Sequence, residues 1–163
     1  MGIVKIPLDI EAALLADRIA ADEIAETVAR CERTRAKTFD PESGAYTGYK
    51  ESGAITLWVC YKTFCGGAEL LDYYFNRTNI LGVSEPAADP DMELGPLLTP
   101  IRDKKPLCCK CDRPLEIRKA LFSYMKRKYY AMAFACPSCG QVYESKEIVR
   151  YRAEKVEPLL EGK

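Results

Sequence analysis

The 163-residue chain contains no histidine. Histidine is the side chain whose charge changes near neutral pH, so it performs many proton transfers and holds many metal ions. Its absence excludes catalysis by Ser-His-Asp or Cys-His groups, and it excludes metal sites with imidazole ligands. Any chemistry must come from Cys, Asp, Glu, Lys or Tyr, so the sequence favours a subunit of an enzyme complex over a catalyst.

Long hydrophobic runs are also missing. The start of the chain lacks the apolar core and the small-residue cleavage site of a secretory signal peptide. No stretch approaches the roughly 18–20 apolar residues of a membrane span, so we expect a cytoplasmic protein. Hydrophobic residues nevertheless make up 48% of the chain, which is enough for a packed core.

The formal net charge is zero because two parts of the chain have opposite charges. Residues 1–100 carry 9 Lys and Arg against 16 Asp and Glu, a net charge of −7. Residues 101–163 carry 15 against 8, a net charge of +7. The two parts attract each other, face different partners, or have solvated surfaces of different composition. The sequence leaves these interpretations open.

Residues 1–82 predict a small α+β module. A helix is expected over 22–36 with Asp22 as its N-cap, because Ile24, Val28 and Cys31 recur at helical spacing. Residues 9–20 form its neighbour or its continuation. Strands rich in β-branched and aromatic residues are expected over 45–51, 54–62 and 68–76. One helix against a three-stranded antiparallel sheet gives this module.

Residues 83–105 predict an acidic, Pro-rich linker. Proline fixes one backbone dihedral and donates no hydrogen bond, so a segment that contains several prolines favours a stiff, extended connector. Such a connector joins two domains or lies across the surface of a partner. The prolines are Pro86, Pro90, Pro96 and Pro100, with Pro106 just beyond.

Residues 106–163 contain two Cys-x-x-Cys pairs, Cys108 with Cys111 and Cys136 with Cys139. Two residues between cysteines let one tight turn present both sulfurs to one metal ion, and an intervening hairpin brings the second pair to the same ion. Strands are expected over 115–124, 129–135 and 141–144, followed by a helix from Ser145. The predicted fold class is therefore α+β, with the module followed by a zinc ribbon and a C-terminal helix.

At these cysteines the chain resembles the zinc-ribbon and rubredoxin-like superfamily. The stretch Cys136-Pro137-Ser138-Cys139-Gly140 is similar to the Cys-Pro-x-Cys-Gly turn of that family. The resemblance implies a closed site in which Cys108, Cys111, Cys136 and Cys139 are the ligands. Asp112 stands where rubredoxins have glycine, and this departure favours Zn²⁺ over the alternative, Fe.

The region from Pro106 onward is also similar to small double Cys-x-x-Cys domains encoded beside oxidoreductases in anaerobic microbes. That resemblance implies an accessory subunit that docks on a larger protein in a redox complex. Two alternatives remain. One is a nucleic-acid-binding zinc ribbon that uses the basic hairpin turn of Lys126, Arg127 and Lys128. The other is a rubredoxin-like electron carrier with Fe in the four-cysteine site.

Four further cysteines lie outside the two pairs. Cys109 is one residue from Cys111, which is too short for a metal-binding turn, so we expect it to be a bystander. Cys60 and Cys65 either meet at a strand end as a redox pair or behave as small apolar residues, as does Cys31. The sequence does not decide whether these three have a redox or metal role.

Overall fold

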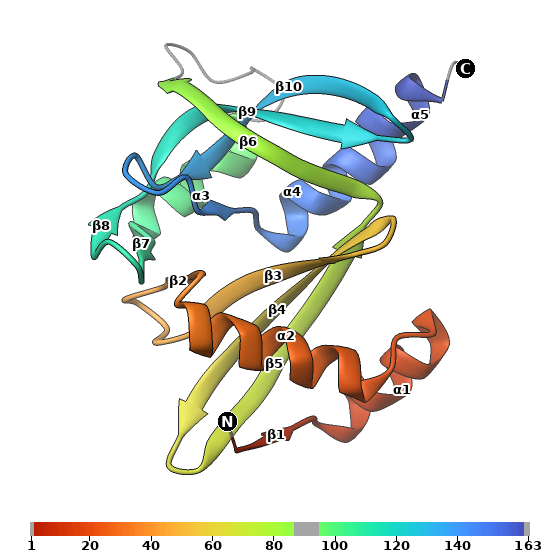
Figure 1. Ribbon diagram of the computed structural model, residues 1–163, viewed down its shortest axis with the longest axis vertical. Helices are drawn as coiled ribbons and strands as arrows, with labels where there is room; N and C mark the ends of the chain where they lie inside the picture. Colours follow the sequence, from red (N-terminus) through yellow and green to blue (C-terminus); the bar gives the residue numbers. More distant parts are fainter. Residues whose placement is uncertain (1, 87–94, 162–163) are drawn as a thin grey trace.

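Two β-sheets organise the chain in the computed structural model, which describes residues 2–86 and 95–161. In those residues one sheet has the strand order β1-β5-β4-β3-β2-β7-β8, and the other has the order β11-β10-β9-β6. Figure 1 shows β1 and β3–β5 of the first sheet in the lower half of the molecule and the second sheet in the upper half. The strands are β1 Ile3–Lys5, β2 Lys37–Phe39, β3 Tyr46–Ser52, β4 Ile55–Phe64, β5 Gly67–Asn76, β6 Thr78–Pro86, β7 Leu107–Cys108, β8 Arg113–Pro114, β9 Glu116–Tyr124, β10 Arg127–Ala135 and β11 Val142–Tyr143. The helices are α1 Leu8–Asp17, α2 Ala21–Thr34, α3 Gly95–Lys104, α4 Lys146–Tyr151, a π-helical turn over Arg152–Val156 and α5 Glu157–Leu160.

One face of the first sheet packs against α1 and α2. Ile24, Val28 and Cys31 of α2 are buried, as their helical spacing predicts, and they contact Val59 and Tyr61 of β4 in one apolar cluster. In Figure 1, α2 crosses β3–β5 in front of the sheet. The predicted N-cap Asp22 is wrong: it lies in the first turn, where its charge favours the helix dipole, and the N-cap is Ala20.

The opposite face of the first sheet packs against the second sheet. Trp58 and Tyr74 share an apolar cluster with Phe122 of β9 and Ala133 of β10. The rings of Trp58 and Tyr74 stack on each other with centroids 5.9 Å apart. The Tyr74 hydroxyl donates a hydrogen bond of 2.7 Å to the Glu144 carbonyl oxygen. These contacts of Trp58 and Tyr74 hold the second sheet on the first.

The predicted mixed α+β class is confirmed, but both sheets are larger than predicted. The three predicted strands correspond to β3, β4 and β5. Short strands extend this meander on both sides: β1 pairs in parallel with β5, and β2 pairs with β3. Strands of two or three residues carry too little sequence pattern to be recognised, because two or three side chains do not define an alternation.

Strands cross between the two halves of the sequence. β6 follows β5 directly but pairs with β9 in the second sheet. In return, β7 and β8 extend the first sheet beyond β2. The predicted boundaries at 1–82, 83–105 and 106–163 therefore do not coincide with sheet membership, and the division into domains stays a prediction.

The predicted extended conformation over 83–105 is wrong for Gly95–Lys104, which form α3. Residues 83–86 are extended, as the last part of β6. Residues 87–94, including Pro90, lie outside the described residues. Pro96 is in the first turn of α3, where a missing N–H costs nothing, and Pro100 removes one interior hydrogen bond. Burial of Leu98 and Ile101 against the second sheet offsets that loss.

The C-terminal helices begin as the sequence predicts. The Ser145 hydroxyl accepts a hydrogen bond from the Ile148 N–H and caps α4. None of the helices in residues 2–86 and 95–161 is both long enough and apolar enough to cross a membrane.

A buried ion pair holds the C-terminal helices on the second sheet. Arg152, fully buried, donates a 2.8 Å hydrogen bond from Nε to Glu144, which is 2% exposed. Its Nη2 donates to the Met132 carbonyl oxygen at 2.9 Å, and its guanidinium lies over the Phe122 ring. Burial raises the pKa of Glu144, and the charge and hydrogen bond of Arg152 act against that rise.

We predict that Arg152→Met lowers the free energy of unfolding by about 3–5 kcal/mol at pH 7, because it leaves the Glu144 carboxylate buried without a counter-charge. The folded variant then binds a proton at Glu144 more tightly than the unfolded chain does. Its stability therefore rises as the pH falls from neutrality towards the ordinary pKa of glutamate. Urea unfolding at several pH values measures both effects. Arg150→Met, at an exposed position of the preceding α4, is the control and should change stability by less than about 0.5 kcal/mol.

Candidate metal centre

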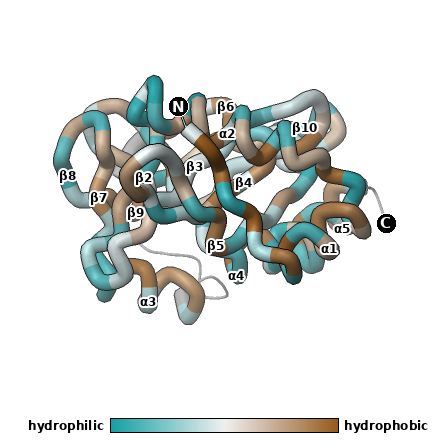
Figure 2. The backbone as a smooth tube through the Cα atoms, turned by 90° about the horizontal axis from the view of Figure 1, so that it is seen from below, coloured by the Kyte–Doolittle hydropathy of each residue, from teal (hydrophilic) through white to brown (hydrophobic). Residues whose placement is uncertain are grey.

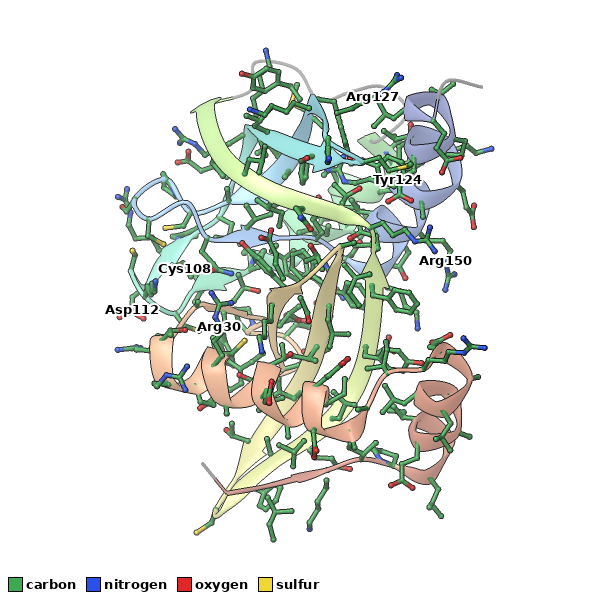
Figure 3. The ribbon with its side chains drawn as sticks, turned by 45° about the vertical axis from the view of Figure 1, so that its right-hand side comes forward. Arg30, Cys108, Asp112, Tyr124, Arg127 and Arg150 are labelled. Carbon is green, nitrogen blue, oxygen red and sulfur yellow. The ribbon has the colours of Figure 1, made fainter. Side chains whose placement is uncertain are left out.

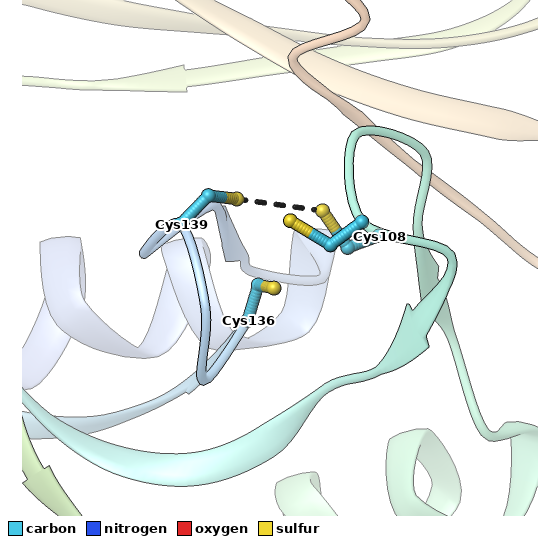
Figure 4. Close-up of side chains that lie close together, drawn as sticks. Cys108, Cys136 and Cys139 are labelled. Carbon is cyan, nitrogen blue, oxygen red and sulfur yellow. Dashed lines mark hydrogen bonds between the residues drawn. The ribbon is translucent and has the colours of Figure 1, made fainter.

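The structure brings the sulfurs of Cys108, Cys111, Cys136 and Cys139 within 4.8 Å of one another. No other set of three or more potential metal-ligating side chains of this kind occurs in the described part of the chain. The sulfurs of Cys108 and Cys139 are 3.5 Å apart (Figure 4). A tetrahedral zinc with bonds of about 2.3 Å keeps its sulfurs about 3.8 Å apart, so the cluster has the dimensions of a four-cysteine metal site.

Each Cys-x-x-Cys pair lies in a turn of the same form. The Asp112 N–H donates to the Cys108 carbonyl oxygen at 2.8 Å, and the Gly140 N–H donates to the Cys136 carbonyl oxygen at 3.0 Å. Both residues that close the turns have positive φ, 51° for Asp112 and 79° for Gly140. Asp112 therefore adopts the backbone conformation that the expected glycine would adopt, although it carries a side chain.

Backbone N–H groups point at the sulfurs from inside the turns. The Ser138 N–H donates to the Cys136 sulfur at 3.4 Å. Burial of Cys136 acts to raise its pKa, but the N–H groups of Cys139 and Ser138 and the neighbouring thiols outweigh burial and lower the pKa to about 7. The pKa of Cys108 is raised to about 12, mainly by burial. Cys136 is therefore the thiol that ionises more readily of these two, and a bound cation would drive the ionisation of the others.

The first cysteine of each pair is buried and the second is less so. Cys108 and Cys136 are 0% and 1% exposed, Cys111 is half-buried and Cys139 is exposed. Four protein sulfurs complete a tetrahedral shell and leave no coordination position for water or substrate. The arrangement suits a structural metal ion or an electron carrier, and four thiolates accept zinc and iron alike.

The cluster lies between the two sheets. Cys108 belongs to β7 and pairs with Thr38 of the first sheet, and the Cys109 N–H donates to the Lys37 carbonyl oxygen at 3.1 Å. Cys136 follows β10 of the second sheet directly. Figure 3 shows Cys108 and Asp112 at the edge of the molecule, between the upper and lower halves. A metal ion held by these four sulfurs would therefore join the sheets.

One contact between the two turns was not anticipated from the sequence. The Arg113 guanidinium donates from Nη1 to the Ser138 hydroxyl at 2.6 Å. Arg113 follows the first turn and Ser138 lies within the second, so their hydrogen bond holds the turns together without a metal. Nothing in the cysteine spacing signals this contact, because the two residues are 25 positions apart.

The other cysteines lie outside the cluster. Cys109 is not part of the sulfur cluster, which agrees with its expected bystander role, and it lines a cavity of about 380 Å³ with Lys37, Cys108 and Asp112. Cys31 is buried beneath Gly48, and Cys65 is exposed in the turn after β4. Cys60 lies in β4 four residues before the strand ends, about 13 Å of extended chain. Of the two alternatives for Cys60 and Cys65, the one in which they meet at a strand end is therefore wrong.

The comparisons with known proteins give a partial match. A family model described as a domain of unknown function (DUF7479) matches residues 104–163, the part of the chain that contains the four cysteines. No curated protein and no solved structure matches the chain. The cysteine cluster itself fits a zinc-ribbon-like site, and the assignment of its four residues as ligands stays a prediction.

We predict that Cys108→Ser abolishes binding of one metal equivalent, whereas Cys109→Ser leaves it unchanged. A serine hydroxyl does not ionise near neutral pH and does not replace a thiolate in the shell. Elemental analysis of protein purified without added metal measures the stoichiometry and identifies the ion. Equal metal content in both variants would show that Cys108 is not a ligand.

We also predict that Asp112→Gly raises the free energy of unfolding of the metal-loaded protein by about 0.5–1 kcal/mol, because glycine adopts positive φ without steric strain. Asp112→Asn is the matched control. It removes the charge but keeps a side chain at the same φ, so a gain confined to glycine identifies the backbone as the cause. Denaturant unfolding at constant metal concentration measures the difference.

Proposed function

We propose that the protein is a non-catalytic accessory subunit whose four-cysteine site holds a structural Zn²⁺, and that it docks on a larger protein of a redox complex. The observation that carries this proposal is the position of the sulfur cluster. Its two turns belong to different sheets, one continuing β7 and the other following β10. An ion at that position fixes the relative placement of the sheets, which is a structural task.

Three arguments support zinc and a redox partner. Zinc in a closed thiolate shell has no redox chemistry and needs only the four sulfurs. Asp112 departs from the glycine of rubredoxins, which favours zinc over an iron carrier. The resemblance of the C-terminal region to domains encoded beside oxidoreductases in anaerobic microbes supports the kind of complex.

The surface of α1 supports docking. Leu8 and Leu15 are 84% and 80% exposed, and a separation of seven residues places them on one face of the helix. Leu14 is buried and Ile10 is partly buried against the first sheet, so α1 has apolar residues on its inner and outer sides. Figure 2 shows hydrophobic residues in β1 and α1 near the N-terminus. We name Leu8 and Leu15 the α1 face.

Acidic side chains flank the α1 face. Asp9 and Glu11 occupy the first turn of the helix and are exposed. A complementary surface therefore has an apolar centre with a basic rim, since like charges at a rim disfavour association. We infer that the larger subunit presents such a surface to α1.

We predict that Leu8→Gln with Leu15→Gln abolishes co-purification of the larger subunit from the native host. Burying a leucine side chain contributes about 1.5–3 kcal/mol, so losing two lowers affinity by on the order of 100-fold or more. Affinity purification of the tagged protein followed by mass spectrometry measures the partner. Both leucines are exposed, so the thermal unfolding temperature should stay near that of the wild type.

Leu159→Gln is the matched control, because Leu159 is a 71% exposed leucine on α5, away from α1. It should retain the partner. If the double variant captures the same partner as the wild type, docking does not use the α1 face. If the wild-type protein is a monomer without any stoichiometric partner, the accessory role itself is contradicted.

The nucleic-acid alternative has weaker support. Lys126, Arg127 and Lys128 are exposed at the tip of the β9–β10 hairpin. However, the Tyr124 hydroxyl at the base of the tip donates to the Glu161 carboxylate, which places an acidic residue next to the basic turn. Figure 3 shows Tyr124 and Arg127 beside the C-terminal helices. A phosphate backbone would meet that carboxylate, so we favour protein docking over nucleic-acid binding.

A further inference from the structure

A two-lobed cleft lies between the sheets. One lobe has a volume of about 380 Å³ and the other about 290 Å³. Five residues line both lobes, so the lobes adjoin. These residues are Thr47, Cys60, Ile101, Lys104 and Tyr143. Small-molecule sites commonly have volumes of roughly 300–1,000 Å³ and occur where two structural layers meet.

The floor of the cleft is a row of polar side chains on the first sheet. The strand register places Asp72 opposite Cys60, Cys60 opposite Thr47, and Thr47 opposite Thr38. The register shifts next to Cys60, which marks a β-bulge in the floor. Bulges occur often beside functional sites because they re-aim side chains.

The roof of the cleft is apolar and firmly held. Leu97 and Pro100 of α3 line the larger lobe. On the inner side of α3, Leu98 and Ile101 are buried in the same apolar cluster as Cys108 of the metal centre. The roof therefore does not need to be assembled around a ligand, and binding loses little conformational entropy there.

Lys104 supplies a charge at the point where the lobes meet. Among the described residues it is the only charged side chain that lines both lobes, and no carboxylate lies within ion-pair distance of its ammonium group. Lys146, at the other end of the larger lobe, is already paired with Asp72 at 3.1 Å. Lys62, which lines only the smaller lobe, forms no ion pair with a described residue either, and the carboxylates of Asp40 and Glu147 line one lobe each. Lys104 is therefore the unpaired cation that a ligand meets where the lobes join, beside the apolar roof.

We propose that this cleft binds a small amphipathic carboxylate. The apolar chain of the ligand lies between Leu97 and Pro100 of the roof and the Thr47–Cys60 floor, and its carboxylate accepts a charge-assisted hydrogen bond from Lys104. This site is separate from the metal centre and from the α1 face. Its ligand class follows from the pairing of the apolar roof with the unpaired Lys104 cation at the junction of the lobes.

The Cys60 thiol serves as a reporter of occupancy and takes no chemical part. Burial raises the pKa of Cys60, and since the thiolate is the form that is alkylated, the alkylation is run at alkaline pH. The thiol is half-buried on the floor, within reach of a small alkylating reagent. A ligand in the cleft would cover it, whereas Cys65 in the exposed turn after β4 would remain open.

The test uses the full-length, metal-loaded protein with hexanoate as the probe. We expect saturable shifts of the backbone amide signals of Thr47, Cys60, Ile101 and Tyr143 in two-dimensional NMR, with millimolar affinity for so small a molecule. Hexanol, which lacks the charge, should bind about fivefold to tenfold more weakly. Hexanoate should also slow the alkylation of Cys60 by iodoacetamide, measured by peptide mass spectrometry, without slowing that of Cys65.

Two variants locate the ligand. Lys104→Gln should weaken hexanoate binding about fivefold to tenfold, whereas Lys105→Gln, one residue away and outside the cleft lining, should leave it unchanged. Cys60→Met fills the floor and should abolish binding while the amide spectrum remains that of a folded protein. Absence of saturable shifts at the cleft residues overturns the proposal. Equal binding of hexanol and hexanoate, or unchanged binding in Cys60→Met, overturns it as well.

Discussion

The convergence of four cysteine sulfurs at the boundary between two sheets is the constraint on which the rest of the structure depends. Cys108 reaches this point on a strand that pairs with β2, and Cys136 reaches it at the end of β10. The sheets also meet at Trp58 and Tyr74, whose rings stack on each other and pack against the second sheet. Between these two places runs the polar row from Asp72 to Thr38 that forms the floor of the cleft. The cleft exists because the sheets are fastened at both ends and not along their whole length.

Buried polar groups add a second constraint, on the C-terminal helices. Arg152 and Glu144 are taken out of water together, and such a pair adds little net stability over apolar residues of the same size. The pair instead restricts how the helix can sit, because Arg152 must also reach the Met132 carbonyl oxygen. Lys146 and Ser145, at the start of that helix, line the larger lobe of the cleft. The buried pair therefore helps to fix one wall of the cleft from a distance.

The sequence predicts features that depend on neighbours along the chain. The spacing of Ile24, Val28 and Cys31 predicts α2, and the two-residue gaps within each cysteine pair predict the sulfur cluster. Features that depend on distant partners are not predictable in this way. β6 and β7 pair with strands that lie far along the chain, β9 and β2 respectively. Their own residues therefore do not indicate which sheet they join. α3 is not predictable from its Pro-rich sequence, because the helix is stabilised by the burial of Leu98 and Ile101 against the rest of the protein. Asp112 shows a subtler limit, since the turn imposes on it the positive φ of the missing glycine.

The division of charge along the chain bears on which surfaces meet other molecules. Among the ion pairs between described residues, only Lys146 with Asp72 joins the acidic residues 1–100 to the basic residues 101–163. Ion pairs between the two parts therefore neutralise little of their charge. Apolar packing around Trp58 holds the two sheets together. Residues 2–82, which carry α1, have 12 Asp and Glu against 9 Lys and Arg, whereas the β9–β10 hairpin carries Lys126, Arg127 and Lys128 at its tip. An acidic surface favours a basic partner, and a basic rim around an apolar site is the complement of α1.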